Sequence, residues 1–184
     1  MQKIVLTFGL ISGAILSVLM LLTLPFESGI GYDTALVIGY TTMVLAFLLI
    51  FFGVRSYRDN VAGGSVSFGR GLAVGLLIMV VASLCYVATW ELVYFKFKPD
   101  FAANYAAHSI ERVRRSGASE AEIQRKVAEL QQFAERYNDP LYNSAVTFLE
   151  PLPVGLVFAL VSAAVLRRKR RAEGGAALEP SAAR

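Results

Sequence analysis

The amino-acid sequence predicts an all-α integral membrane protein with four transmembrane helices and an extracytoplasmic antiparallel helical hairpin between the third and the fourth. Charged residues make up 17% of the chain, whereas about a quarter of the residues of a soluble protein are charged. The apolar residues are grouped into four segments of about 20 residues, the length that crosses a bilayer as a helix. These segments are residues 4–24, 34–54, 71–95 and 145–166.

A chain of 184 residues corresponds to one domain or one small membrane bundle. A soluble protein of this size could not bury four helices that are apolar on all faces, which argues against a soluble fold. We therefore expect a single membrane domain over residues 1–171 and a disordered cytoplasmic tail over residues 172–184. The bilayer is the expected environment and partner.

The first segment, residues 4–24, follows Lys3 and could be mistaken for a secretory signal. Its apolar core is longer than the 7–15 residues of a typical signal, and no small-x-small cleavage site follows it. We interpret this segment as a retained membrane helix.

The charges between the segments predict the orientation. The first connection has two acids and no Lys or Arg, the second, residues 55–70, is basic, and the fourth segment is followed by "RRKRR" from Arg167. By the positive-inside rule, the N-terminus, the second connection and the C-terminus are cytoplasmic. The basic residues are then membrane anchors that meet anionic lipid, and no nucleic-acid partner is expected.

The third connection predicts the helical hairpin, residues 100–138. Asp100 follows Pro99 as an expected N-cap, and Ser119 with Glu122 forms a capping box. Each arm carries a narrow apolar stripe at helical spacing: Phe101, Tyr105, Ser109 and Val113, then Ile123, Val127, Leu130, Ala134 and Tyr137. The hairpin packs on itself or on the bundle in one interpretation. In the other it binds a protein partner, forms a homo-oligomer or lies on the membrane surface, although a membrane-surface helix usually carries a broader apolar face.

The cytoplasmic connection contains Arg55, Arg58, Asp59 and Arg70 around the pair Gly63 and Gly64. The two glycines allow a tight turn at positive φ, and the arginines can extend to the headgroups. No Gly-Lys-Ser/Thr sequence follows, so the glycines do not predict a nucleotide site. Runs of small residues, such as Gly9 and Gly13, instead predict close helix packing.

Three stretches resemble one family. "GVRSYRDNVAGGSVSFGRGLAVGL" from Gly53 is similar to the hallmark region of the domain of unknown function 4199, a bacterial group. "YVATWELVYFKFKPDF" from Tyr86 and "TFLEPLPVGLVFALVSAAVL" from Thr147 are similar to its third and fourth segments. The resemblance implies a four-helix protein of the bacterial inner membrane. It implies no activity and no catalytic residue.

Two acids lie near the outer boundary. Glu91 follows Arg70 by about 30 Å of helix and Glu150 precedes Arg167 by about 25 Å, at 1.5 Å per residue. Pro151 and Pro153 lack amide hydrogens, so they predict a kink with freed carbonyls. Glu150 and Glu91 thus form a candidate outward-facing ion or proton site. The alternative is an interfacial acid that pairs with Lys96 or Lys98.

Two functions follow from these features. The first is a non-enzymatic inner-membrane protein whose outer hairpin is a partner-binding or assembly element. The second is a small transporter or channel that uses the acidic site. One histidine and one cysteine leave no usual soft-ligand zinc site, so no metal, other cofactor or enzymatic activity is expected.

Overall fold

The computed structural model describes residues 1–24 and 32–167, and its regular structure there is helical. The helices are α1 (Gln2–Thr23), α3 (Tyr32–Asn60), α4 (Phe68–Phe97), α5 (Phe101–Arg114), α6 (Glu120–Arg136), α7 (Pro140–Leu149) and α8 (Leu152–Leu166). Within the described residues, four stretches are long and apolar enough to cross a membrane: α1, most of α3, α4, and α7 together with α8. The prediction of an all-α protein with four membrane helices is confirmed. The expected tail, residues 172–184, lies outside the described residues.

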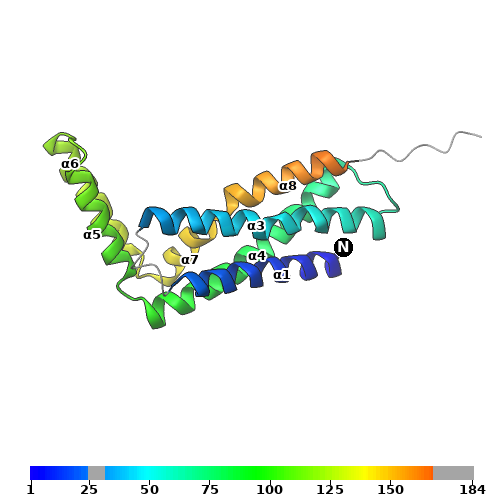
Figure 1. The fold of residues 1–184 in the computed structure, drawn as a ribbon, viewed down its shortest axis with the longest axis horizontal. Helices are drawn as coiled ribbons and strands as arrows, with labels where there is room; N and C mark the ends of the chain where they lie inside the picture. Colours follow the sequence, from blue (N-terminus) through cyan, green and yellow to red (C-terminus); the bar gives the residue numbers. More distant parts are fainter. Residues whose placement is uncertain (25–31, 168–184) are drawn as a thin grey trace, which may run out of the picture.

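The four membrane stretches lie side by side (Figure 1). Helix α4 contacts α1, α3 and α8, and α3 also contacts α1 and α8. The N-terminus, the α3–α4 connection and the end of α8 lie at one end of the bundle, and α5 and α6 project from the other end (Figure 1). The bundle therefore has a loop end and a hairpin end.

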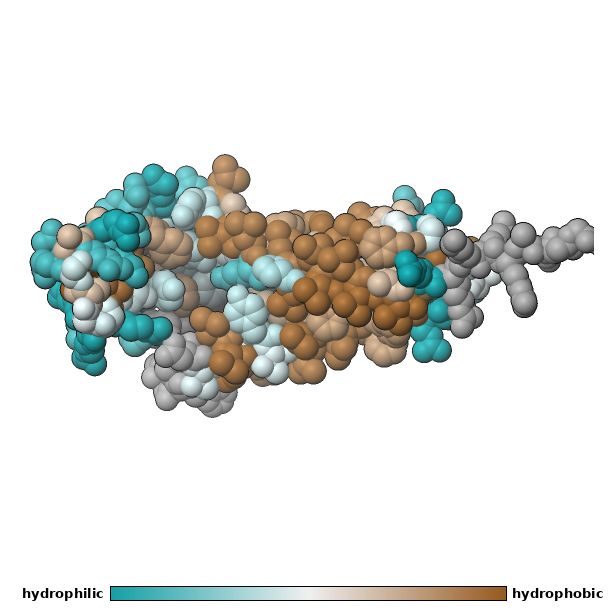
Figure 2. Space-filling model, turned by 90° about the horizontal axis from the view of Figure 1, so that it is seen from above, coloured by the Kyte–Doolittle hydropathy of each residue, from teal (hydrophilic) through white to brown (hydrophobic). Residues whose placement is uncertain are grey.

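The sides of the bundle are apolar. Figure 2 shows a hydrophobic band along the membrane helices, with hydrophilic side chains at both ends. Large apolar side chains face outward on all four membrane stretches, and examples are Leu22, Val37 and Val165, which are 61%, 65% and 65% exposed. A continuous exposed apolar surface marks contact with something other than water. Together with the helix lengths, this band indicates a protein embedded in a membrane.

Small residues set the helix spacing, as the sequence predicts. A Cβ placed on Gly9 would lie 2.6 Å from Cβ of Val81, and one on Gly13 would lie 2.6 Å from Cβ of Cys85, so α1 rests directly on α4. On the opposite side of α4, a Cβ on Gly75 would lie 3.0 Å from Cβ of Ala159. Membrane helices gain stability from this close approach, because lipid supplies no hydrophobic force between them.

The helices extend beyond the predicted limits. Helix α3 continues to Asn60 instead of residue 54, because polar residues past the hydrocarbon core still satisfy their backbone hydrogen bonds within a helix. The fourth stretch begins at Pro140 instead of residue 145. Asp139 caps it, accepting hydrogen bonds from the amides of Leu141 and Tyr142 at 2.8 and 3.1 Å.

Helices α5 and α6 pack against each other. Ser119 caps α6 by accepting a hydrogen bond from the Glu122 amide at 3.4 Å. Asp100 occupies the N-cap position of α5 but makes no side-chain capping bond. The turn between the helices contains Gly117 at φ +74°, a conformation that glycine adopts without steric cost.

Candidate functional site

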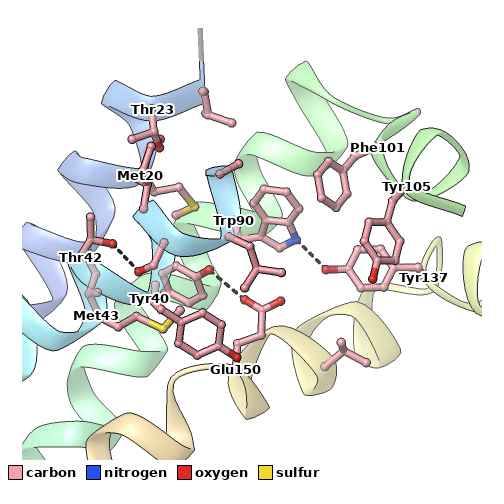
Figure 3. Close-up of a pocket in the computed structure, with 18 of the residues that line it drawn as sticks. Met20, Thr23, Tyr40, Thr42, Met43, Trp90, Phe101, Tyr105, Tyr137 and Glu150 are labelled. Carbon is pink, nitrogen blue, oxygen red and sulfur yellow. Dashed lines mark hydrogen bonds between the residues drawn. The ribbon is translucent and has the colours of Figure 1, made fainter. Parts of the chain in front are cut away.

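A cavity of about 480 Å³ lies where the hairpin end of the bundle meets α5 and α6 (Figure 3). Side chains from α1, α3, α4, α5, α6 and α7 line it, and so does Glu150, which lies at the interruption between α7 and α8. Most of the lining is apolar or aromatic. Cavities of this size and composition are typical of small-molecule sites.

An aromatic cluster forms the wall nearest the hairpin. The members that line the cavity are Trp90, Phe101, Tyr105, Phe133 and Tyr137, and Tyr94 packs on Trp90 and Tyr137 without lining it. The rings of Trp90 and Phe101 meet edge to face with centroids 4.9 Å apart, and those of Phe133 and Tyr137 are 5.1 Å apart. Each such pair contributes about 0.5–1.5 kcal/mol beyond its buried area. The aromatic cluster therefore fixes α5 and α6 to α4.

Buried hydrogen bonds strengthen this junction. Nε1 of Trp90 donates to the hydroxyl of Tyr137 at 3.0 Å, and that hydroxyl lies 3.3 Å from Oγ1 of Thr147. Thr147 donates to Oδ1 of Asn143, whose Nδ2 donates to the carbonyl of Tyr137, both at 3.2 Å. Burial raises the pKa of Tyr137 to about 12, so its hydroxyl stays protonated at neutral pH. These hydrogen bonds form a closed network that joins α4, α6 and α7.

Glu150 places a carboxylate on the cavity wall. It follows the last residue of α7, and its Oε2 accepts a hydrogen bond from the hydroxyl of Tyr86 at 2.9 Å. The side chain is exposed at the cavity and points toward the region between Tyr40 and Trp90 (Figure 3). No basic side chain of the described residues pairs with it. The expected pairing with Lys96 or Lys98 is therefore not formed there.

Comparison with known proteins places this architecture in a family. The chain matches the family described as "Protein of unknown function (DUF4199)" over residues 7–168, which is most of its length. The chain belongs to the DUF4199 family. No curated protein and no solved structure matches it. The resemblance predicted from the sequence is thus confirmed, and the role of this DUF4199 cavity has to be argued from its residues.

Glu91 does not join Glu150 in the cavity. It is half-buried on α4, its Oε1 is buried without a hydrogen-bond partner among the described residues, and it does not line the cavity. The reason is helical geometry. Tyr86 and Trp90 are four residues apart and share a face of α4, whereas Glu91 is rotated by about 100° from Trp90. The two-acid site expected from the sequence is therefore a one-acid site in this DUF4199 chain.

The two prolines lie where the fourth stretch changes direction. Helix α7 ends at Leu149 and α8 begins at Leu152, so the break falls on Glu150 and Pro151. Pro151 and Pro153 supply no amide hydrogen to the preceding turn, which explains why one continuous helix does not form. The break directs the carboxylate of Glu150 toward the cavity.

The residues of the predicted cytoplasmic connection lie at the loop end of the bundle, away from the cavity (Figure 1). Nε of Arg58 donates to Oδ1 of Asp59 at 2.6 Å, and Nε of Arg55 is 3.7 Å from Oδ2 of Asp59. Gly63 and Gly64 have φ of 65° and 81°, which forms the tight turn. The amide of Arg70 donates to Oγ of Ser67, the N-cap of α4, at 3.4 Å. These residues organise a loop and contribute nothing to the cavity.

Proposed function

We propose that this DUF4199 chain is a non-enzymatic protein of the bacterial inner membrane whose outer hairpin, α5 with α6, is a partner-binding or assembly element. The observation that carries the proposal is the apolar stripe of α6. We define the distal stripe as Ile123, Val127 and Leu130. All three residues remain only half-buried although α5 packs beside them, and no residue of α6 is fully buried.

The distal stripe matters because two paired helices with narrow apolar stripes can bury most of that apolar surface against each other, and α5 with α6 does not. The stripe instead keeps apolar area available for a further element. Burial of such area on association supplies about 25 cal/mol per Å². A second copy of this chain, or a protein with a matching stripe, would bury it.

Photo-crosslinking tests the hairpin proposal. With p-benzoylphenylalanine at position 127, irradiation of native membranes should give a discrete adduct to a second copy or to another protein. Adding Ile123→Asp or Leu130→Asp should abolish the adduct, because each buries a charge in the contact. Gln131→Asp is the matched control on an exposed position of α6. The proposal is wrong if no adduct forms, or if the stripe variants leave the adduct unchanged.

The charge distribution supports an orientation with both termini in the cytoplasm. Arg55, Arg58 and Arg70 belong to the loop end, and Arg167 follows α8 at the same end. Positive charge concentrates on the cytoplasmic side of membrane proteins. A single cysteine at Ser116 in a Cys85→Ala background should react with an impermeant maleimide in intact cells. A cysteine at Ser65 should react only after permeabilisation, and the opposite pattern would reverse the orientation.

The second candidate function is an outward-facing ion or proton site at Glu150. The cavity favours it, since Glu150 lines the wall. Transport through one chain is less favoured, because core side chains of the bundle such as Phe47, Ile50 and Ile78 are 0% exposed. Ion or proton flux into proteoliposomes that depends on Glu150 and is lost in Glu150→Gln would support transport. Equal flux in both proteins would dismiss it.

A further inference from the structure

We propose that the cavity binds an organic ammonium ion with an apolar body, with Glu150 as its counter-ion and the surrounding aromatic rings as its walls. This binding site is independent of the distal stripe, so either proposal can fail alone. The argument rests on the size and lining of the cavity, on the single carboxylate, and on the rings beside it.

The cavity fits a compact organic molecule better than a bare ion. Its volume of about 480 Å³ lies in the range that holds a small molecule. The lining combines large apolar side chains, such as Met20 and Met43, with aromatic rings, such as Tyr40 and Trp90 (Figure 3). An apolar body that occupies this space would exchange water contact for contact with these side chains.

The carboxylate of Glu150 determines which charge a ligand of this cavity should carry. Glu150 is the one acid among the described residues that line the cavity, and the described residues supply it with no basic partner. A carboxylate beside apolar walls is costly unless an opposite charge or hydrogen bonds accompany it. The hydroxyl of Tyr86 donates a hydrogen bond to Oε2 of Glu150 at 2.9 Å and so orients the carboxylate. An ammonium ion would supply the missing positive charge.

A metal ion fits this site less well. Calcium and magnesium need about six oxygen ligands, several of them charged. No group of three or more His, Cys, Asp or Glu side chains that could hold a metal occurs within residues 1–24 and 32–167. A substituted ammonium ion requires one counter-charge and tolerates apolar surroundings, which is what the cavity offers.

The aromatic side chains favour a cation over a neutral molecule. Trp90, Tyr40 and Tyr86 line the cavity together with Glu150. The faces of such rings attract cations, and tryptophan attracts them most strongly. The N–H of Trp90 is already bound to Tyr137, so that residue interacts with a ligand through its ring.

Arg112 on α5 also lines the cavity, and it lies 3.4 Å from Nε2 of His108. Because Glu150 is the one acid among the described residues of the lining, the site matches a ligand with a single positive charge. Such an ammonium group can belong to a free amine or to the headgroup of a lipid, because the cavity lies at the hairpin end of the membrane bundle.

The chain itself supplies the probe for the test, because Trp90 is its single tryptophan. In detergent solution, titration of the purified full-length protein with benzyltriethylammonium should change the Trp90 emission saturably. Glu150→Gln keeps an acceptor for Tyr86 but removes the charge, and it should weaken the apparent affinity at least tenfold. Glu91→Gln removes an acid outside the cavity and should leave the affinity unchanged. Benzyl alcohol, a neutral analogue, should give no comparable response.

Two further measurements keep the test decisive. Glu150→Asp retains the charge and should bind within a few fold of the unmodified protein, which covers the case in which Glu150→Gln does not fold. In nanodiscs, the ratio of the affinities of the unmodified protein and Glu150→Gln within one lipid cancels the attraction of an anionic surface for the probe. A smaller ratio in phosphatidylethanolamine than in phosphatidylglycerol would identify the lipid headgroup as the competing ligand, and an equal ratio would identify a free amine. Absence of a saturable response, or an equal response in Glu150→Gln, would overturn the proposal.

Discussion

The hydroxyl of Tyr86 donates a 2.9 Å hydrogen bond to Oε2 of Glu150, joining residues 64 positions apart in the chain. The bond links α4, at the hairpin end of the membrane bundle, to the break between α7 and α8. Since the break is where two prolines interrupt backbone hydrogen bonding, this side-chain bond restrains a point that the backbone itself leaves weak.

A double-mutant cycle tests the strength of this link. Tyr86→Phe and Glu150→Ala each remove one partner of the bond and should each destabilise the protein, with a coupling energy of about 0.5–1.5 kcal/mol, the range found for polar pairs in membrane proteins. Unfolding in mixed detergent micelles measures the free energies. Tyr40→Phe combined with Glu150→Ala is the control, because Tyr40 also lines the cavity and no hydrogen bond joins it to Glu150. Equal coupling in the two cycles would contradict a specific Tyr86–Glu150 bond.

A second prediction concerns the contact between α1 and α4. Gly9→Ala should lower the free energy of unfolding by about 1–3 kcal/mol. The added Cβ would lie 2.6 Å from Cβ of Val81, an atom close to the backbone that cannot move aside alone.

Gly39→Ala is the matched control, because a Cβ at Gly39 meets no atom within 4 Å. It should leave stability unchanged or raise it slightly, since alanine favours helix more than glycine does. The same micelle titration measures both variants. Equal losses of unfolding free energy in the two variants would show that the packing of α1 on α4 does not depend on the close contact at Gly9.

Much of this architecture is visible in the sequence because a bilayer imposes strict local rules. Apolar length sets the number of spanning helices, and small residues at intervals of four, such as Gly9 and Gly13, mark the close helix contact. Capping residues such as Ser119 mark a helix start. Each of these signals depends on residues that are near one another in the chain, so no tertiary information is needed.

The site was harder to predict because it depends on contacts between distant segments. Trp90 and Tyr137 are 47 positions apart, and nothing local indicates that α6 returns to α4. The sequence placed Tyr137 on a stripe of the hairpin but did not indicate which helix that stripe contacts. It placed Glu91 and Glu150 at similar depths but gave no information on rotation about the helix axis. Depth follows from counting residues, whereas the facing of a side chain depends on how helices pack.

A third prediction concerns the buried bond between Trp90 and Tyr137. Tyr137→Phe keeps the ring but leaves the N–H of Trp90 without its acceptor, so it should destabilise the protein by about 1–3 kcal/mol. Tyr142→Phe is the control, because Tyr142 packs on Phe133 and its hydroxyl bonds to no other described residue. A loss as large in Tyr142→Phe would show that the cost of Tyr137→Phe does not come from the bond to Trp90.

The same pair of proteins gives a pH dependence. Burial raises the pKa of Tyr137 to about 12, whereas an unfolded tyrosine titrates near 10. A group whose pKa rises on folding stabilises the fold fully below its unfolded pKa, and the effect is lost as the pH passes the folded value. The stability difference between the unmodified protein and Tyr137→Phe should therefore be constant below about pH 10 and shrink between about pH 10 and 12. A difference that shrinks between pH 6 and 8 would assign the effect to another group.

The last prediction concerns the turn that joins α5 and α6. Gly117 has φ +74°, and a Cβ there would meet no atom within 4 Å. Gly117→Ala therefore tests backbone strain without a clash, at a cost of about 1 kcal/mol. Because the turn lies at the tip of the hairpin (Figure 1), the strain should act locally and speed amide exchange in α5 and α6 about fivefold. Gly69→Ala, whose added Cβ also meets no atom within 4 Å and whose φ is not positive, should not change exchange in the hairpin.

Binding of benzyltriethylammonium at Trp90 should stay intact in Gly117→Ala while crosslinking from position 127 weakens. Loss of both would mean that the cavity and the hairpin tip form one cooperative unit.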